Sequence, residues 1–302
     1  MRNSMKPWIE AARPKTLPLA LASTLLGSFL AAAEHQFHWN VFFLAAFTTV
    51  LLQILSNLAN DYGDFANGKD NAGRVGPRRM VQSGEILPSS MVSAIVLVTA
   101  CTFIAGIALI VAGTEGGPPL VKVFFVLLGI ASIAAALKYT IGNNPYGYHG
   151  WGDLSVFIFF GIIGTVGTYV LHTHHITAKV FLPAACIGFL SAGVLNVNNL
   201  RDETTDKQTG KRTLVVLLGK DRAKMYQVLL LVFAVLSGCL STILNYRSGI
   251  QFLFLCVLPF LVKHIRSVIQ NIHPEELNIE LKNLSLSTLF FSVSFGVGLI
   301  FR

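Results

Sequence analysis

The stretch VFFLAAFTTVLLQILSNLANDYGD, residues 41–64, decides the fold class of this chain. It is mostly apolar over about the 20 residues that a helix needs to cross the hydrocarbon core of a membrane. Its last turns are polar and carry two carboxylates, which are costly at membrane depth and mark a functional site by default. The stretch therefore predicts a membrane-spanning helix with chemistry at one end.

Similar apolar segments recur along the rest of the chain, which has 302 residues and is 53% hydrophobic and only 13% charged. A soluble domain carries about 25% charged residues, so the composition predicts a polytopic membrane protein. We expect residues 1–302 to form one all-α membrane domain, a bundle of about nine transmembrane helices. The predicted helices are residues 16–33, 41–64, 90–112, 120–141, 153–171, 178–200, 224–244, 249–265 and 283–301.

The net charge of +8 also raises the possibility of a nucleic-acid partner. If the N-terminus is placed in the cytoplasm, all but four of the 23 lysines and arginines fall on the cytoplasmic side. The four on the outer side are Lys122, Lys179, Arg247 and Arg302. This asymmetry is the one expected of a protein in a lipid bilayer. We therefore expect no nucleic-acid partner.

Polar residues form a stripe at the end of predicted helix 41–64. Asn57, Asp61 and Asp64 are spaced by four and by three residues, so they share one helix face. Carboxylates this close repel each other and favour a bound cation. Oxygen ligands without His or Cys suit Mg²⁺, which fills its remaining positions with water and substrate phosphates.

A second stripe lies four helices later, at the end of predicted helix 178–200. Asn198, Asp202 and Asp206 are spaced by four and four residues and again share a face. Two such helix ends facing each other could hold metal ions bridged by a diphosphate. We therefore expect the active site at the cytoplasmic ends of the second and sixth helices.

Basic loops follow both stripes, at about 65–89 and 201–223, and with a third loop at about 138–152 we expect them to cap the site. Arg and Lys side chains are the usual partners of phosphate groups. Cytoplasmic loops of membrane proteins are commonly basic whether or not they bind a ligand. The functional interpretation therefore depends on the observation that these loops directly follow the acidic stripes. The candidate ligands of the diphosphate are Asn57, Arg74, Arg78, Arg79, Asn198 and Lys211.

At these residues the sequence resembles the UbiA superfamily of intramembrane aromatic prenyltransferases, which carries two Asp-rich motifs on helices 2 and 6 of a nine-helix bundle. The first motif reads NLANDYGD (57–64) and the second NNLRDETTD (198–206). Within the superfamily, the stretches PYGYHGWGD (145–153), VFIFFG (156–161) and 198–219 are most similar to the members that prenylate 1,4-dihydroxy-2-naphthoate in menaquinone synthesis.

The resemblance implies that Mg²⁺ binds the diphosphate and that the allylic C–O bond ionises. The aromatic ring then attacks the prenyl cation, and loss of CO₂ gives demethylmenaquinone. Tyr139, with Tyr62 and Tyr146, could face the cation. The residues implied as metal ligands are Asn57, Asp61, Asp64, Asp202 and Asp206, with Asp70 ranked below them because many relatives have their third acidic residue at the position of Gly68.

Three points stay open from the sequence. The acceptor could be another aromatic compound such as 4-hydroxybenzoate. The catalytic base could be Lys138, Tyr139 or Asp153. A cation-coupled transporter could also place Asp and Asn in its helices, although transporter sites lie near the bilayer midplane rather than at helix ends with basic loops. The expected location is a bacterial cytoplasmic membrane with the active site facing the cytoplasm.

Overall fold

A computed structural model of the chain describes residues 5–70 and 75–302. Within these residues the only regular secondary structure is helical, and nine helical segments are long and apolar enough to cross a membrane. The prediction of an all-α membrane bundle is confirmed.

The first five spans contain α1 and α2 (Lys6–Ala12 and Leu17–Ala32), α3 (Trp39–Ala66), α4 (Pro88–Gly113), α5 (Pro119–Lys138), and α6, η3 and α7 (Gly152–Val156, Phe157–Ile163 and Gly164–Thr173). The last four contain α8 (Phe181–Gln208), α10 (Lys220–Leu244), η5 and α11 (Gly249–Val257 and Leu258–Gln270), and α12 (Leu277–Ile300), with the short α9 (Leu214–Leu218) between α8 and α10.

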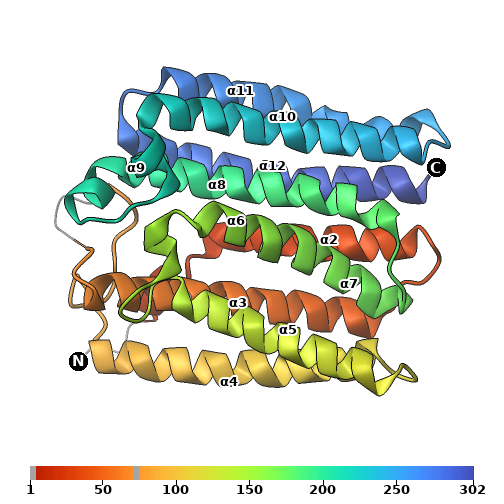
Figure 1. Cartoon of the computed structure of the whole chain (residues 1–302), viewed down its shortest axis with the longest axis horizontal. Helices are drawn as coiled ribbons and strands as arrows, with labels where there is room; N and C mark the ends of the chain where they lie inside the picture. The colour runs from red at the N-terminus through yellow and green to blue at the C-terminus, as the bar shows by residue number, and fades with distance from the viewer. Residues whose placement is uncertain (1–4, 71–74) are drawn as a thin grey trace.

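The long helices run side by side along the longest axis of the molecule (Figure 1). The connections after α3 and α8 gather at one end of the bundle, together with α9 (Figure 1). We call this the motif end, because α3 and α8 carry the two acidic stripes there. The C-terminus lies at the other end, which we call the far end (Figure 1).

Helix α8 forms the centre of the bundle, with 72% of its most apolar window buried against 6% for α5 at the periphery. The largest buried cluster joins α8 to α2, α10, η5 and α12 through residues such as Ile187, Leu190 and Phe291. A central helix that is buried all round holds its polar end in a fixed position. This burial places the second stripe inside the protein rather than at a surface.

Several helices extend beyond their predicted bounds, among them α8 and α12. Helix α8 continues to Gln208 rather than ending near residue 200, and α12 begins at Leu277 rather than near 283. Hydropathy marks where a chain leaves the lipid, whereas these helix ends are held by packing against neighbours. The extension of α8 keeps the whole second stripe, from Asn198 to Asp206, on one rigid helix.

Candidate functional site

Asp61 on α3 is buried and accepts hydrogen bonds from the backbone N–H groups of Met80 and Val81, both at 3.0 Å. A carboxylate that accepts two backbone N–H bonds fixes the segment that donates them. Asp61 therefore fastens the loop before α4 to the end of α3.

Asp64, one turn further along α3, is the centre of a buried charge cluster. Its carboxylate forms an ion pair with the guanidinium of Arg79 and accepts a hydrogen bond from the hydroxyl of Tyr148 at 2.7 Å. The ammonium of Lys211 lies 2.9 Å from the same carboxylate. Arg79 also approaches Asp70, with 3.7 Å between Nε and Oδ1. Segments from three connections thus converge on one side chain.

Lys211 joins the two acidic stripes. Its ammonium lies 2.9 Å from Asp64 on α3 and 3.8 Å from Asp206 on α8, and all three side chains are buried. One cation is therefore shared between a carboxylate of each stripe, as a metal ion would be. The two helix ends face each other, and the carboxylate oxygens that they contribute are the kind of donor that a divalent cation such as Mg²⁺ prefers.

Asp202 is held by the neighbouring Arg201, whose Nε and Nη2 atoms donate to its two oxygens at 2.9 and 2.7 Å. The same guanidinium donates to Asn198 at 2.9 Å and to Asn278 at 3.0 Å. Arg201 is almost fully buried, so this fork positions the second stripe against α12. Sequence reasoning missed this role, although a basic residue directly before a motif carboxylate was a visible signal.

Asn57 binds the N-terminal segment. Its amide nitrogen donates to the carbonyl oxygen of Ala12 at 2.9 Å and to the hydroxyl of Thr16 at 3.1 Å, while its oxygen accepts from Gln53. Arg78 is exposed and pairs with Glu85 at 3.1 Å. Arg74 lies outside the described residues. The roles assigned to these three residues stay predictions.

The basic side chains explain why no group of three or more His, Cys, Asp and Glu residues is placed to hold a metal within residues 5–70 and 75–302. Asp64, Asp202 and Asp206 each have a cationic partner that neutralises part of their repulsion. For the carboxylates to come closer together around a metal ion, these basic side chains would have to leave them and bind another anion. A diphosphate is an anion of the right kind.

Tyr148 is a second residue that sequence reasoning missed. Its ring faces two ammonium groups, those of Lys211 at 5.1 Å and Lys69 at 5.9 Å from the ring centroid. Lys69 also donates to the carbonyl oxygen of Thr209, which ties the loop after α3 to the end of α8. Burial and the nearby Asp64 carboxylate raise the pKa of Tyr148. The phenol therefore stays protonated and donates to Asp64.

A cavity of about 940 Å³ opens beside the charge cluster. Polar side chains from α3, α8 and the connections line it near the motif end, and apolar side chains of α2, α3, η3, α8 and α12 line the remainder. The polar group includes Asn57, Asn60, Arg78, Tyr139, Tyr146, Asn198 and Arg201, and the apolar group includes Leu19, Leu52, Phe159, Phe160, Ile163, Val194 and Leu281. A ligand with a charged head and a hydrocarbon tail matches this division.

Tyr139 lies between the cavity and the charge cluster. It lines the cavity, its ring meets that of Tyr146 edge-on at 5.4 Å, and Asp153, Asp64 and Asp206 act on its hydroxyl electrostatically. Gly152 lies so close that a Cβ there would stand 2.8 Å from the Tyr139 hydroxyl. Burial, and then the nearby Asp153, raise the pKa of Tyr139, so it carries a proton at neutral pH. Tyr139 therefore fits a ring that faces a cation better than a base.

Three other candidates, Asp153, Tyr62 and Lys138, do not line the cavity. Asp153 is buried, and neither of its carboxylate oxygens has a hydrogen-bond partner. Tyr62 packs in an apolar cluster with Met80 and Val81 and does not line the cavity. Lys138 at the end of α5 is exposed.

Comparison with known proteins decides the family. The UbiA prenyltransferase family matches residues 20–292. The chain belongs to this family. It is therefore a membrane-bound prenyltransferase, and the resemblance stated from its motifs is confirmed.

Two bacterial relatives of the UbiA family align with nearly all of the chain. A 1,4-dihydroxy-2-naphthoate octaprenyltransferase of Haemophilus influenzae is 41% identical over 302 residues, covering 99% of this chain and 97% of its own. The enzyme of the same name from Escherichia coli is 40% identical over 292 residues, covering 97% and 94%. Such coverage means that the sequence similarity extends along nearly the whole chain and is not confined to the motifs.

The fold is also that of solved UbiA proteins. A UbiA homologue from Archaeoglobus fulgidus, bound to GPP and Mg²⁺, superposes with a TM-score of 0.67 over 98% of this chain and 100% of its own, at 13% identity. An apo UbiA homologue from Aeropyrum pernix gives 0.67 over 95% and 96%, at 17% identity. At these identities the likeness establishes the fold alone.

Proposed function

We propose that this UbiA-family enzyme transfers a polyprenyl group from polyprenyl diphosphate to 1,4-dihydroxy-2-naphthoate in a Mg²⁺-dependent reaction. The C–O bond between the prenyl carbon and the diphosphate breaks, and a C–C bond forms to the ring. The ring carboxylate leaves as CO₂, and its bonding electrons return to the aromatic system. The product has the demethylmenaquinone skeleton of menaquinone synthesis, at the oxidation level of its hydroquinone.

The observation that carries this proposal is the cation shared between the two stripes, beside a cavity with one polar and one apolar end. Lys211 lies between Asp64 and Asp206 where the ends of α3 and α8 face each other. Relatives at about 40% identity that bear the naphthoate octaprenyltransferase name support the acceptor. The GPP and Mg²⁺ of the Archaeoglobus homologue support the donor and the metal.

Acidic residues would bind the metal ion, and basic residues would bind the diphosphate. Asp64 and Asp206, with Asp61 and Asp202, would hold Mg²⁺, which when bound supplies positive charge to the leaving diphosphate. Asp61 would first have to release the N–H groups of Met80 and Val81.

Basic residues complete the site for the diphosphate. Lys211 and Arg79 now neutralise Asp64, and they would turn to the diphosphate oxygens when these arrive. The buried position of both cations makes their charge effective, because little water screens them.

The cavity would hold the prenyl chain and the reactive cation. Phe159, Phe160 and Ile163 on η3 offer an apolar wall for the chain. Tyr139 and Tyr146 line the polar end, where their ring faces could stabilise positive charge on the prenyl group. The surrounding helices exclude water that would otherwise capture the cation.

We further propose that the enzyme lies in a bacterial cytoplasmic membrane with its motif end and N-terminus facing the cytoplasm. The distribution of lysines and arginines supports this orientation, because only four of 23 fall on the outer side. The polar substrates would then reach the site from the cytoplasm.

The test is turnover by the purified full chain in detergent, with 1,4-dihydroxy-2-naphthoate and octaprenyl diphosphate, in Mg²⁺ and in EDTA. Asp64→Asn and Asp206→Asn should each lower kcat by at least about 100-fold, the size expected when a main electrostatic group is lost. Glu203→Gln is the matched control: it removes a carboxylate of α8 that belongs to neither stripe and accepts a hydrogen bond from the neighbouring Thr204, and it should stay active. Product with 4-hydroxybenzoate but not with the naphthoate would overturn the acceptor and keep the reaction class.

A further inference from the structure

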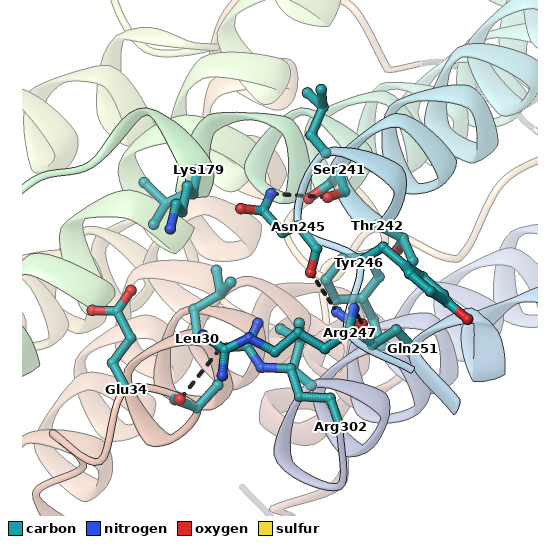
Figure 2. Close-up of a pocket in the computed structure, with 15 residues that line it drawn as sticks. Leu30, Glu34, Lys179, Ser241, Thr242, Asn245, Tyr246, Arg247, Gln251 and Arg302 are labelled. Carbon is teal, nitrogen blue, oxygen red and sulfur yellow. Dashed lines mark hydrogen bonds between the residues drawn. The ribbon is translucent and has the colours of Figure 1, made fainter. Parts of the chain in front are cut away.

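A second cavity, of about 280 Å³, lies at the far end of the bundle (Figure 2). The ends of α2, α10 and α12 and the short η4 (Ala178–Val180) before α8 meet around it, and its wall is rich in polar and charged groups. The lining includes Leu30, Glu34, Lys179, Ser241, Thr242, Leu244, Asn245, Tyr246, Arg247, Gln251 and Arg302. Prenyl transfer at the motif end does not involve this cavity, which is separated from the charge cluster by the length of the bundle.

Three of the four basic residues that the sequence assigns to the outer side line this one cavity: Lys179, Arg247 and Arg302. Only Lys122, at the start of α5, lies elsewhere. Basic residues are scarce on the outer side of membrane proteins, so their convergence from three separate segments is not explained by topology. The convergence of these three basic residues indicates a binding site with positive charge.

The positive charge at the cavity is only partly balanced, by Glu34, which acts electrostatically on Arg302. Within the described residues, Lys179, Arg247 and Arg302 make no ion pair. Glu34, the one acidic residue of the lining, already accepts a hydrogen bond from Tyr169 at 2.7 Å and faces His175 at 3.4 Å. Like charges brought together disfavour each other's charged forms, so the cavity favours an anionic ligand.

The two guanidinium groups lie close together, as the close-up shows (Figure 2). Arg302 is fixed in place by a hydrogen bond to the carbonyl oxygen of Ala33. Partial burial, and then the neighbouring Arg247, lower the pKa of Arg302. A pair of guanidinium forks at this spacing suits the oxygens of a phosphate group.

The rim of the cavity exposes large hydrophobic side chains. Leu244 and Tyr246 belong to the lining, yet their side chains are largely exposed, and Ile250 beside them is exposed as well. Tyrosine is typical of the level of the headgroups in a bilayer. These residues lie at or just after the C-terminal end of α10, which is at the far end of the bundle (Figure 1). A ligand in the cavity could extend hydrocarbon chains along this face.

We propose that the far-end cavity binds the phosphate headgroup of an acidic phospholipid, with its acyl chains along the exposed apolar face of α10 and η5. Arg247 and Arg302 bind the phosphodiester, and Lys179 adds charge. A zwitterionic headgroup fits less well, because it would bring its own cation to a site that already has three. The bound lipid would join the ends of α2, α8, α10 and α12.

The test measures lipid binding to the detergent-purified full chain by native mass spectrometry, with phosphatidylglycerol, phosphatidylcholine and inorganic phosphate as probes. We expect the wild type to prefer phosphatidylglycerol. Arg247→Gln should weaken its binding about tenfold, as expected when a charge-assisted hydrogen bond is lost, and Arg247→Lys should weaken it less. Lys122→Gln removes one outer charge away from the cavity and is the matched control.

The thermal unfolding midpoint without lipid and prenyl-transfer activity should be unchanged in these variants, which shows that they are folded. Equal retention of phosphatidylglycerol by the wild type, Arg247→Gln and Lys122→Gln would overturn the proposal. Binding of inorganic phosphate without a preference among lipids would overturn it too, by assigning the site to a free anion. If Arg247→Gln fails to fold, the wild type's preference between the two lipids still decides.

Discussion

At the scale of single residues, Lys211 has the most consequential position. It is 211 residues into the chain, yet its ammonium lies between one carboxylate of α3 and one of α8. Removing one partner of a buried charge pair leaves the other charges uncompensated. Lys211 therefore stabilises the resting arrangement of the two stripes and is available to a phosphate.

Replacing Lys211 by Met should lower the free energy of unfolding by about 1.5–3 kcal/mol, the range for a hydrogen bond to a charged group. Mg²⁺ should restore part of the loss, because it can replace the ammonium between Asp64 and Asp206. The measurement is the thermal unfolding midpoint in EDTA and in Mg²⁺. Lys211→Arg, which keeps the charge, is the control. Equal effects of Mg²⁺ on the wild type and Lys211→Met would contradict the shared-cation geometry.

Tyr148→Phe removes the hydroxyl that donates to Asp64 and keeps the ring beside the ammonium of Lys211. We expect a loss of about 1 kcal/mol in the free energy of unfolding near pH 7. The pKa of Tyr148 is raised in the folded state by burial and by Asp64. Its contribution is therefore complete below about pH 10, the unfolded pKa of tyrosine, and is lost as the pH rises further.

The matching measurement is chemical unfolding of both proteins between pH 7 and 11. The difference between wild type and Tyr148→Phe should shrink above about pH 10. A difference that stays constant across this range would show that the hydroxyl does not bind Asp64.

At the scale of elements, the close contact of η3 with α8 determines how the cavity wall meets the central helix. Gly161 on η3 and Gly188 on α8 approach so closely that a Cβ on Gly161 would stand 2.5 Å from the Gly188 Cα. Small residues allow helices in membranes to pack at such distances. The π-helical turn Phe157–Ile163 carries the apolar wall and is held at this contact.

Gly161→Ala should destabilise the protein by about 1–3 kcal/mol, the usual cost of overpacking a core, and should also change the preference for prenyl chain length. Gly129→Ala on α5 is the control, since a Cβ there meets nothing within 4 Å. It should be neutral or slightly stabilising, because Ala favours the helix over Gly. Thermal unfolding and competition between donors of different length give the two readouts. An equal response of the two variants would show that the contact does not limit packing.

The C-terminal end of helix α8 could not be predicted from local sequence. Its apolar segment was predicted, but its extension to Gln208 was not, because residues 201–208 are polar and resemble a loop. Burial of Arg201, Asp202 and Asp206 against other elements compensates for that polarity. Such compensation depends on partners far away in the sequence.

At the scale of the whole molecule, a metal ion and a diphosphate would bind both stripes at once, where Lys211 alone is now shared between Asp64 and Asp206. A metal and a diphosphate that bind only the folded state should stabilise it, by about 2.7 kcal/mol at a concentration of 100 times the dissociation constant. We expect Mg²⁺ together with a non-hydrolysable prenyl diphosphate to raise the unfolding midpoint far more than either alone, since each supplies ligands to the other.

Adding EDTA should abolish the joint effect, and Asp206→Asn should reduce it strongly while Glu203→Gln leaves it intact. Differential scanning fluorimetry in detergent gives the measurement. Additive effects of the metal and the diphosphate would argue against a site in which they meet.

The sequence by itself determined the class of fold and the family. Hydropathy reports how each segment meets the lipid, and the spacing of acidic residues reports which of them share a helix face, and both are local properties. The family match confirmed the resemblance carried by the motifs. The assignment of individual residues to metal and diphosphate stays a prediction.

Only the tertiary structure decided which charges meet. It placed Lys211 between the two stripes, turned Tyr148 towards Asp64, and brought Lys179, Arg247 and Arg302 to one cavity. None of these contacts has a signal in the sequence, because a charge has a partner only where packing brings distant segments together. The apolar surfaces that direct this packing surround α8, and their complementarity is a property of the assembled bundle.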